Sequence, residues 1–470
     1  MNADLNELLN ALPQDLAESA PDLPREQLQR IFADLAMRRP PTSSLHRVWS
    51  VGELGVQVAL ACGVRTVRGW FSDAGERERQ QLESNLRIGL RIFHRLSYLR
   101  GTLMKLGQMA GSMPHLAPAQ IVDTLDRLRF DAPPMHFSLI REVVENDLGR
   151  SPEEIFQSFE QNAFAAASIG QVHRAALKSG ERVAVKIQYP GIARTIDADM
   201  RSIGALLAPV RLAFGDAIEG KFEEIRSMMK QEVDYKQEAE SLGFARSVFA
   251  DRDDIVVPRV HPEYSGSRVL TMDYLSGVHV DDFLAGNPSQ ELRDAFGAKI
   301  CFAWYRMHAE KMNYADPHSG NYLFMNDGRL GLIDFGCMQH FSDNAYKSLG
   351  ESLQMAAGGT AAVREILLAE GIPESELGDE AFLKIIVESS RWIAEPLRHA
   401  GPFDYGDPTH LKARFEWGSG LAANKTIMRN GTPAWMYYHR SNIALLALLY
   451  RLGARVDMSQ FPIAEWWSKK

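Results

Sequence analysis

The stretch that decides the fold reads Tyr314-Ala-Asp-Pro-His-Ser-Gly-Asn321 and, after a short gap, Ile333-Asp-Phe-Gly336. Asp316 is followed five residues later by Asn321 and thirteen residues after that by Asp334. A phosphoryl-transfer site of the kinase type needs this order. The first Asp orients or deprotonates the attacking group, while the Asn and the second Asp hold magnesium on the nucleotide phosphates. Asp-Phe-Gly alone recurs by chance, so the interpretation depends on what lies upstream.

Three upstream segments supply the remaining parts of such a site. Val183-Ala-Val-Lys186 ends an expected strand that starts after a turn at Ser179-Gly180, where a lysine reaches the α- and β-phosphates. That lysine needs a carboxylate from a helix, and Glu238 lies in a helical stretch. Met272-Asp273-Tyr274 ends the last strand before the helical half, where a nucleotide base would bond to the backbone. The order of these parts predicts a kinase-like fold.

Short β-type runs come first and helices follow, which predicts an α+β chain with a small sheet lobe and a larger helical lobe. A helix over Ser138–Leu148 that ends at Gly149 precedes the sheet, Ile192–Val248 is a helical block, and nearly everything after 280 is helical except 314–336. The expected strands are Glu154–Phe159, Ser168–Leu177, Arg182–Gln188, Ile255–Val260 and Arg268–Tyr274.

The predicted architecture is a two-lobed protein-kinase-like fold with an N-terminal helical extension and a helical C-terminal region. We expect residues 1–90 to form the extension and 91–150 a further helical segment. The first lobe is expected over 151–275, the catalytic core of the second lobe over 276–355, and its helical remainder over 356–470.

Two departures from an ordinary protein kinase narrow the interpretation. The phosphate-covering loop of a kinase is Gly-x-Gly-x-x-Gly, but here it reads Phe164-Ala-Ala-Ala-Ser-Ile-Gly-Gln171. Alanines restrict φ and put methyl groups where backbone amides approach the phosphates, so nucleotide is expected in a different register. After Gly336 the chain runs Cys-Met-Gln-His-Phe-Ser-Asp343 into a helix without Ala-Pro-Glu. The usual platform for a peptide substrate is therefore not evident.

These departures match a family, because the chain resembles the UbiB (AarF-type) atypical kinase-like proteins over roughly 95–345. That family includes mitochondrial proteins supporting coenzyme Q synthesis. The motifs that carry the resemblance are Lys105-Leu-Gly-Gln108, the run Ala165, Ala166, Ala167 and Ser168, Glu232-Val-Asp234, and Asp316-Pro-His318. The pair of Lys-x-Gly-Gln and Glu-x-Asp is specific, since ordinary kinases lack both.

The resemblance implies roles for these residues. Lys105 would pair with Glu232, with Asp234 beside it, and Gln108 would face the nucleotide from a helix over the substrate entrance. One acidic helix would then serve both Lys105 and Lys186. The implied cofactors are ATP and Mg²⁺. Tyr314 and Ser319 depart from the family's His and Pro, but neither change removes a charge that catalysis needs.

Composition and charge limit the partners. Apolar residues make up 45% and charged residues 24% of the 470 residues, as in soluble globular proteins, and no run of 18 apolar residues predicts a membrane span. The net charge of −8 disfavours nucleic acid. Arg38 to Lys105 nevertheless carries 12 basic against 5 acidic residues, so this segment could face an anionic membrane. Val48–Phe71 is either a membrane-touching amphipathic helix or, as we favour, a helix packed on the main domain.

Cysteine usage and the N-terminus predict a cytoplasmic protein, with membrane association left open. Three cysteines lie far apart without metal spacing, and the N-terminus lacks a basic-then-apolar secretion signal. Cys337 follows Asp-Phe-Gly and is either redox-sensitive or, as we favour, a small buried residue.

The sequence favours an ATP-binding enzyme with Mg-dependent ATPase activity. Its context, an isoprenoid lipid, lipid-modifying proteins or ubiquinone synthesis, comes from the resemblance alone. A protein kinase acting in trans is a second hypothesis, disfavoured by the alanine loop and the occluding helix. A non-catalytic, nucleotide-gated or lipid-binding scaffold is a third, and it would not need both Asp316 and Asp334.

Overall fold

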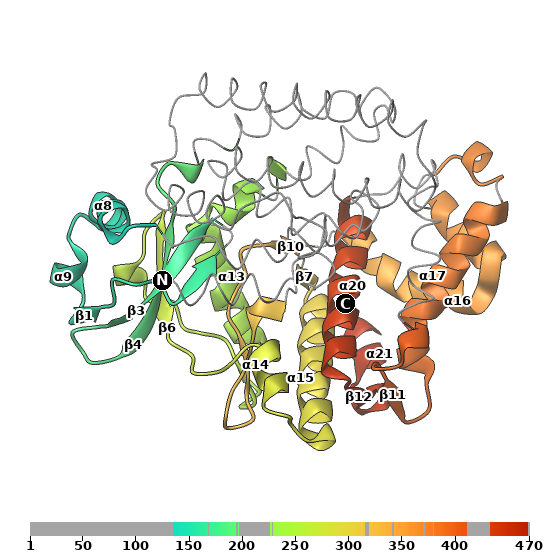
Figure 1. Cartoon of the computed structure of the whole chain (residues 1–470). Helices are drawn as coiled ribbons and strands as arrows, with labels where there is room; N and C mark the ends of the chain where they lie inside the picture. Colours follow the sequence, from blue (N-terminus) through green and yellow to red (C-terminus); the bar gives the residue numbers. More distant parts are fainter. Residues whose placement is uncertain are drawn as a thin grey trace, which may run out of the picture. The chain divides into compact units, whose positions relative to one another are not determined.

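The computed structural model describes residues 135–167, 169–193, 196, 226–227, 229–314, 319–340, 343–369, 372–378, 380–410 and 433–468 (Figure 1). The predicted extension over 1–90 lies outside these residues, and so do Lys105 and Gln108 of the segment that follows it, the basic segment from Arg38 to Lys105, Ser168 and Asp316. The described chain is α+β, as predicted.

The chain divides into two compact units. One takes in the chain up to Ala175 together with Val185–Val233, and the other takes in Ala176–Ala184 together with the chain from Asp234. The finer domain boundaries that the sequence suggested stay predictions.

Two helices come first in the described part of the first unit. Helix α8, Phe137–Leu148, confirms the prediction, and it ends because Gly149 takes a left-handed φ of 72° and donates its N–H to the carbonyl of Glu145. The expected strand over 154–159 was wrong except for its last two residues, Ser158–Phe159. Pro152–Ile155 forms helix α9, since Ser151 and Glu154 make a capping box and Pro152 stands at the first helical position.

The main sheet has the strand order β1-β3-β4-β6, with β2 paired to β3. Its strands are β1 Ser158–Phe159, β2 Ala165–Ala167, β3 Gly170–Ala176, β4 Arg182–Gln188 and β6 Val269–Asp273. All of β4 beyond Arg182 is buried, which explains its continuous apolar run around a single lysine.

Helix α13, Tyr235–Val248, begins the longer part of the second unit. The chain then forms strand β5, Ile255–Val256, and the short helix η2, Pro262–Tyr264, before β6. Helices α14, Val280–Ala285, and α15, Gln290–Ala309, follow. Eleven residues of α15 are buried, Trp304 and His308 among them, so this helix forms part of the core of the unit.

Four short strands interrupt the helices where the sequence predicted an exception at 314–336. They are β7 Met312–Tyr314, β8 Tyr322–Phe324, β9 Leu330–Leu332 and β10 Met338–His340, with the short helix η3, Ser319–Asn321, between β7 and β8. Strand β9 lies between β5 and β8, while β10 pairs with β7. The predicted non-helical segment is confirmed, and its strands run from Met312 to His340, slightly beyond the expected 314–336.

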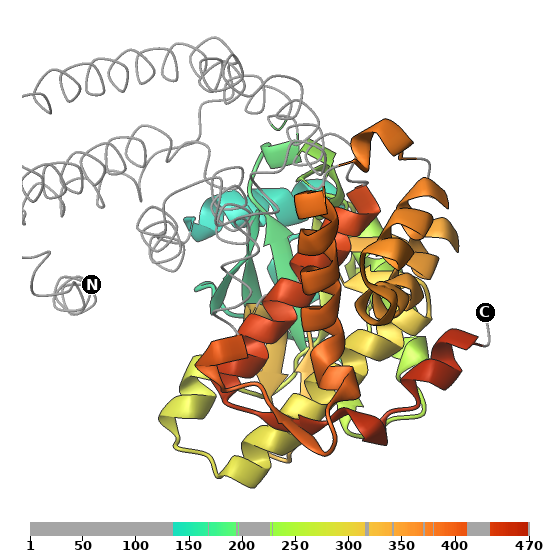
Figure 2. The same ribbon diagram turned by 90° about the vertical axis from the view of Figure 1, so that its right-hand side faces the viewer.

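The remaining described chain is largely helical, as predicted, and contains a long-range strand pairing that the sequence did not indicate. Figures 1 and 2 show α16 beside α17 and α20 beside α15. Strands β11 and β12 pair antiparallel. The elements are α16 Asp343–Ala369, η4 Glu374–Glu376, α17 Glu380–Arg398, β11 Pro402–Asp404, α20 Pro433–Leu452, β12 Arg455–Asp457, η5 Met458–Gln460 and α21 Ile463–Ser468. Within the described ranges, every helix is too short or too polar to cross a bilayer.

Candidate nucleotide and metal site

The hairpin of β8 and β9 brings the two predicted metal ligands to one end. Tyr322 pairs with Leu332 in the antiparallel register. One step beyond that pair, the N–H of Ile333 donates to the carbonyl of Asn321 at 3.1 Å. Asp334 is the next residue, so Asn321 and Asp334 leave the hairpin at the same end although they are thirteen positions apart in the sequence.

This donor set fits a magnesium ion. Mg²⁺ prefers oxygen ligands and is usually held by one or two carboxylates together with phosphates and water. Asn321 offers an amide oxygen and Asp334 a carboxylate, and both residues are only partly buried. Asp334 Oδ1 also accepts the N–H of Gly336 at 3.0 Å, which fixes the carboxylate against its own turn. Asn321 and Asp334 would therefore hold the ion.

A second carboxylate lies against the same turn. A Cβ atom placed on Gly336 would lie 3.4 Å from Asp334 Oδ1 and 3.6 Å from Glu238 Oε2. Glu238 comes from α13 and is only 1% exposed. Helix α13 thus carries its predicted carboxylate to the Asp-Phe-Gly turn, and glycine at position 336 keeps the space between the two carboxylates free of a side chain.

Lys186 is buried on β4, with 4% of its surface exposed. A buried ammonium group is costly unless an opposite charge or hydrogen bonds compensate it, so its burial is consistent with a built site and not with a surface lysine. Lys186 and Glu238 belong to different compact units, and their pairing stays a prediction.

The alanine-rich loop forms a tight hairpin. Ala165, Ala166 and Ala167 form β2 and pair with Val172, Gln171 and Gly170 of β3, so only two residues lie between the last paired positions. The sequence had placed a strand from Ser168, whereas β3 begins at Gly170. The predicted contacts of the three alanines and Ser168 with nucleotide stay predictions.

Sequence reasoning missed Gln171, which anchors this hairpin. It is 1% exposed, and its Oε1 accepts the N–H of Met135 at 2.9 Å. Its Nε2 lies 3.0 Å from His173 Nε2, and His173 Nδ1 lies 2.8 Å from the carbonyl of Glu160. Desolvation lowers the pKa of His173, so a neutral ring that donates at Nδ1 and accepts at Nε2 satisfies both contacts. Two polar residues at alternate positions of β3, Gln171 and His173, were the available signal.

The hinge segment Met272-Asp273-Tyr274 ends β6, where the sequence placed it. Two of its backbone donors are used within the protein. The N–H of Asp273 donates to the carbonyl of Arg259 at 2.9 Å, and that of Tyr274 donates to the carbonyl of Arg182 at 3.1 Å. A nucleotide base would therefore have to use carbonyl groups or other backbone donors of this region.

The idea of one acidic helix that carries Glu232, Asp234 and Glu238 was wrong. Helix α13 begins at Tyr235, and Asp234 is its N-cap. The carboxylate of Asp234 accepts the N–H groups of Lys236 and Gln237, both at 3.1 Å, which gives Asp234 a structural task. Glu232 precedes the cap and is 7% exposed. Its predicted pairing with Lys105 lies outside the described residues.

The chain around the predicted catalytic Asp316 is framed by described strands. Strand β7 ends at Tyr314, and Met338 of β10 pairs with Tyr314. The segment after Asp-Phe-Gly thus returns along the strand that leads to Asp316, and α16 already starts at Asp343. Cys337 is 4% exposed, in agreement with the favoured interpretation of a small buried residue.

Comparison with known proteins supports the kinase-like fold that the sequence predicts. The model of the ABC1 atypical kinase-like domain matches residues 127–365. The chain is 28% identical to the mitochondrial atypical kinase COQ8 of Saccharomyces cerevisiae over 433 residues, 89% of this chain and 84% of that protein. It is 30% identical to the mitochondrial atypical kinase COQ8B of Rattus norvegicus, over 78% of this chain and 70% of that protein. A solved structure of Rv3197 from Mycobacterium tuberculosis in complex with erythromycin is 25% identical, with a TM-score of 0.55 over 83% of this chain and 97% of that one.

Proposed function

Because the chain belongs to the ABC1 atypical kinase-like family, we propose that it binds ATP together with Mg²⁺ at the end of the β8–β9 hairpin and hydrolyses it. The observation that supports this most is the register of the hairpin, which sets Asn321 beside Asp334, with Glu238 against the same turn. A carboxylate and an amide at one end of a hairpin suit a hydrated cation that bridges phosphates.

In this proposal each residue has a distinct task. Lys186 neutralises the α- and β-phosphates, Glu238 holds Lys186, and Asn321 and Asp334 hold Mg²⁺. Asp316 orients a water molecule for attack on the γ-phosphorus and takes up its proton. The bond from the γ-phosphorus to the bridging oxygen breaks, and ADP and inorganic phosphate leave. Bound Mg²⁺ supplies neutralisation of the phosphate charge.

Phosphate release by the purified chain tests the proposal. The Asp334→Asn variant should lose at least about a hundredfold of Mg-dependent release, because the ion loses a charged ligand next to the transferred group. Asp327→Asn is a matched control, since Asp327 lies at the opposite end of the same hairpin and is paired with Arg329. It should behave like the unmodified chain. Equal release by the Asp334→Asn variant and the unmodified chain would leave the scaffold hypothesis standing.

Incorporation of labelled phosphate in the same assay separates hydrolysis from protein phosphorylation. Release without label on the chain or on added protein supports the ATPase. Stoichiometric label on added protein would favour the kinase acting in trans. The short path from β10 to α16, which leaves little chain for a substrate platform, supports the first outcome.

We propose that this activity serves ubiquinone or other isoprenoid lipid metabolism, through a lipid or lipid-modifying proteins. The resemblance to the UbiB family and the COQ8 names of the relatives support this context. The basic segment from Arg38 to Lys105 would provide peripheral contact with an anionic membrane. Flotation with anionic liposomes, with and without residues 1–75, tests that contact, and equal flotation would exclude it. Mass spectrometry of co-purifying lipid would identify the ligand.

A further inference from the structure

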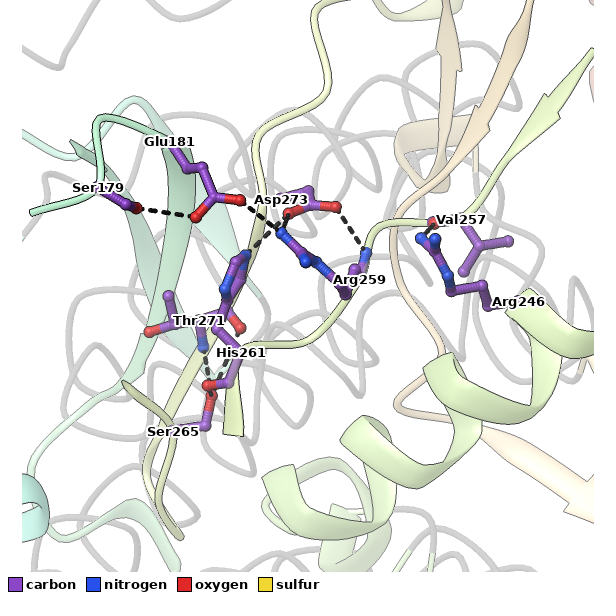
Figure 3. A network of polar contacts seen from close by, with 9 residues as sticks. All are labelled: Ser179, Glu181, Arg246, Val257, Arg259, His261, Ser265, Thr271 and Asp273. Carbon is purple, nitrogen blue, oxygen red and sulfur yellow. Dashed lines mark hydrogen bonds and ion pairs between the residues drawn. The ribbon is translucent and has the colours of Figure 1, made fainter. Parts of the chain in front are cut away.

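The side chain of Asp273 lies on the opposite face of β6 from that of Met272. Alternate residues of a strand face opposite sides, so Thr271 and Asp273 share one face. Residues 261–265 cover that face. Thr271 Oγ1 donates to the carbonyl of Tyr264 at 2.6 Å, and Ser265 Oγ accepts the N–H of Thr271 at 3.0 Å. Figure 3 shows the carboxylate of Asp273 directed toward His261 and Arg259, and Thr271 next to Ser265, so this carboxylate makes its contacts within the protein.

The carboxylate of Asp273 closes a short antiparallel pairing between residues 259–261 and 271–273. The backbone contributes two bonds, from His261 N–H to the Thr271 carbonyl at 2.8 Å and from Asp273 N–H to the Arg259 carbonyl at 2.9 Å. Asp273 Oδ2 then accepts the N–H of Arg259 at 3.2 Å, and Oδ1 accepts Nε2–H of His261 at 2.8 Å. The His261 side chain is only 5% exposed, so this last bond is shielded from water.

A weaker, solvent-exposed branch extends to the turn between β3 and β4. The Arg259 guanidinium lies 2.8 Å from Glu181 Oε1, and Ser179 Oγ donates to Glu181 Oε2 at 2.8 Å. Both charged side chains are about half exposed, at 51% and 50%, so water screens their attraction. Glu181 should therefore matter less than His261.

The residue after Asp273 is tied to the same turn. The N–H of Tyr274 donates to the carbonyl of Arg182, and the guanidinium carbon of Arg182 lies 4.5 Å from the centroid of the Tyr274 ring. The two ends of the hinge are thus fixed by different groups, Asp273 by His261 and Arg259, and Tyr274 by Arg182.

We propose that His261 and Arg259 are positioning residues for nucleotide recognition: by holding the carboxylate of Asp273, they fix the backbone of Met272-Asp273-Tyr274 where it reads the nucleotide base. The inference rests on the proposed function, since it takes ATP as the ligand. In this inference the backbone of Asp273 contacts the nucleotide, and its side chain holds the hinge segment in place. Loss of the network should therefore weaken base binding and leave phosphate binding unchanged.

Paired affinity measurements on the full chain test this. For His261→Ala, the affinity for MgATP should fall about tenfold, which corresponds to about 1.4 kcal/mol and lies near the contribution of a charge-assisted hydrogen bond. The affinity for Mg-tripolyphosphate, which has no base or ribose, should not change. In turnover the loss should appear in KM and not in kcat.

Three further variants make the test specific. His261→Gln keeps an N–H donor that can reach Asp273 and should restore most of the ATP affinity. Glu181→Gln should change it by less than about twofold, because that pair is exposed. Glu263→Gln removes an exposed charge from η2, next to the network, and is the control.

Unchanged ATP affinity in His261→Ala would overturn this inference and leave the proposed function intact. Equal weakening of ATP and tripolyphosphate, without rescue by glutamine, would show a merely structural role and would also overturn it. Failure of the unmodified chain to bind MgATP would overturn the proposed function and this inference with it.

Discussion

At Gly336 a side chain would find ordinary contact distance to two carboxylates, the nearer at 3.4 Å, whereas at Gly297 of α15 it would meet the Cβ of Ala454 at 2.5 Å. Both positions are glycines in the second unit, but one borders charged oxygen atoms and the other a close apolar contact. Val456 and Leu449 complete the surroundings of Gly297, and all these neighbours are buried. At the hairpin end glycine keeps a side chain away from two carboxylates, where we propose that the cation binds, while on α15 it lets another element approach.

This difference distinguishes the candidate site at the end of the β8–β9 hairpin from the close-packed core around α15. A methyl group added at the hairpin end competes with whatever binds there, and should cost function more than stability. A methyl group added on α15 has no place to go, because the opposing atom is attached directly to the backbone and cannot rotate away. It should cost stability first. The five substitutions below test whether the two regions can be separated in this way.

Gly297→Val has the largest expected effect. Overpacking a close contact typically costs about 1–3 kcal/mol, and a branched side chain against Ala454 and Val456 should reach about 3 kcal/mol or more. The midpoint of denaturant unfolding should fall accordingly.

Gly350→Ala in α16 is the matched control, since nothing lies within 4 Å of its added Cβ. Alanine should raise stability there by about 0.5–1 kcal/mol, the usual gain over glycine inside a helix. Equal midpoints for the two variants would contradict the assignment of Gly297 to a close-packed contact.

From the burial of His308 we predict that the free energy of unfolding depends on pH, independently of the candidate site. Its Nδ1 donates to the carbonyl of Trp304 at 2.7 Å, and burial lowers its pKa to about 4. An unfolded chain regains the ordinary pKa of about 6.5 and binds a proton that the folded chain does not. The free energy of unfolding should therefore fall as the pH drops from about 6.5 to about 4, by up to about 3 kcal/mol at 1.36 kcal/mol per unit.

His308→Asn tests this with little change in the local bond. The Asn amide can donate to Trp304 but does not titrate in this range. Unfolding free energies measured between pH 4 and 7 should be flatter for the variant than for the unmodified chain, since all other groups titrate alike in both. Parallel curves would show that His308 is protonated, or exposed, in the folded chain.

Much of the fold could be predicted because the relevant signals are local. The helix that Gly149 ends, the strand of Lys186 and the short β segment between Tyr314 and Asp-Phe-Gly all follow from spacing and turn residues. The helix at Pro152–Ile155 was missed because its capping box outweighed the β-type run that follows. The β11–β12 pairing joins residues about fifty positions apart, and no local pattern indicates such a partner.

In the candidate site, too, some features could be predicted from the sequence and others could not. Order along the chain was sufficient to predict that Asn321, Asp334 and Glu238 serve one site, and the structure brings Asn321 and Asp334 to one end of the hairpin with Glu238 against the same turn. Their roles as ligands stay predictions. The N-cap role of Asp234 depends on where α13 begins, and the hinge role of the Asp273 carboxylate depends on which face of β6 it occupies. A shift of one residue, in where α13 begins or in which face of β6 Asp273 occupies, would change either role. Sequence periodicity does not locate elements to within one residue.

Gly336→Ala tests the glycine at the end of the β8–β9 hairpin, the counterpart of Gly297 in the comparison. The contact distances allow the methyl group, so the unfolding midpoint should change by less than about 1 kcal/mol. The methyl group would lie between Asp334 and Glu238 and exclude water or a cation from their oxygens. Mg-dependent nucleotide affinity should fall about tenfold, or about 1.4 kcal/mol. A variant with normal affinity but lowered stability would place Gly336 with Gly297 and remove the distinction.

Ala166→Gly should have the smallest effect on nucleotide binding. Ala166 is exposed on β2 and pairs with Gln171, so glycine removes a methyl group from the loop that we predict to cover the phosphates, at a cost of about 0.5–1 kcal/mol in strand stability. The buried anchor at Gln171 should keep the hairpin in place. We expect a shift of about threefold in the ratio of ATP to ADP affinity, together with more self-phosphorylation, because the backbone can approach the phosphates more closely. Titration of both nucleotides and label incorporation measure this, and if neither changes, alanine at this position does not set the nucleotide register.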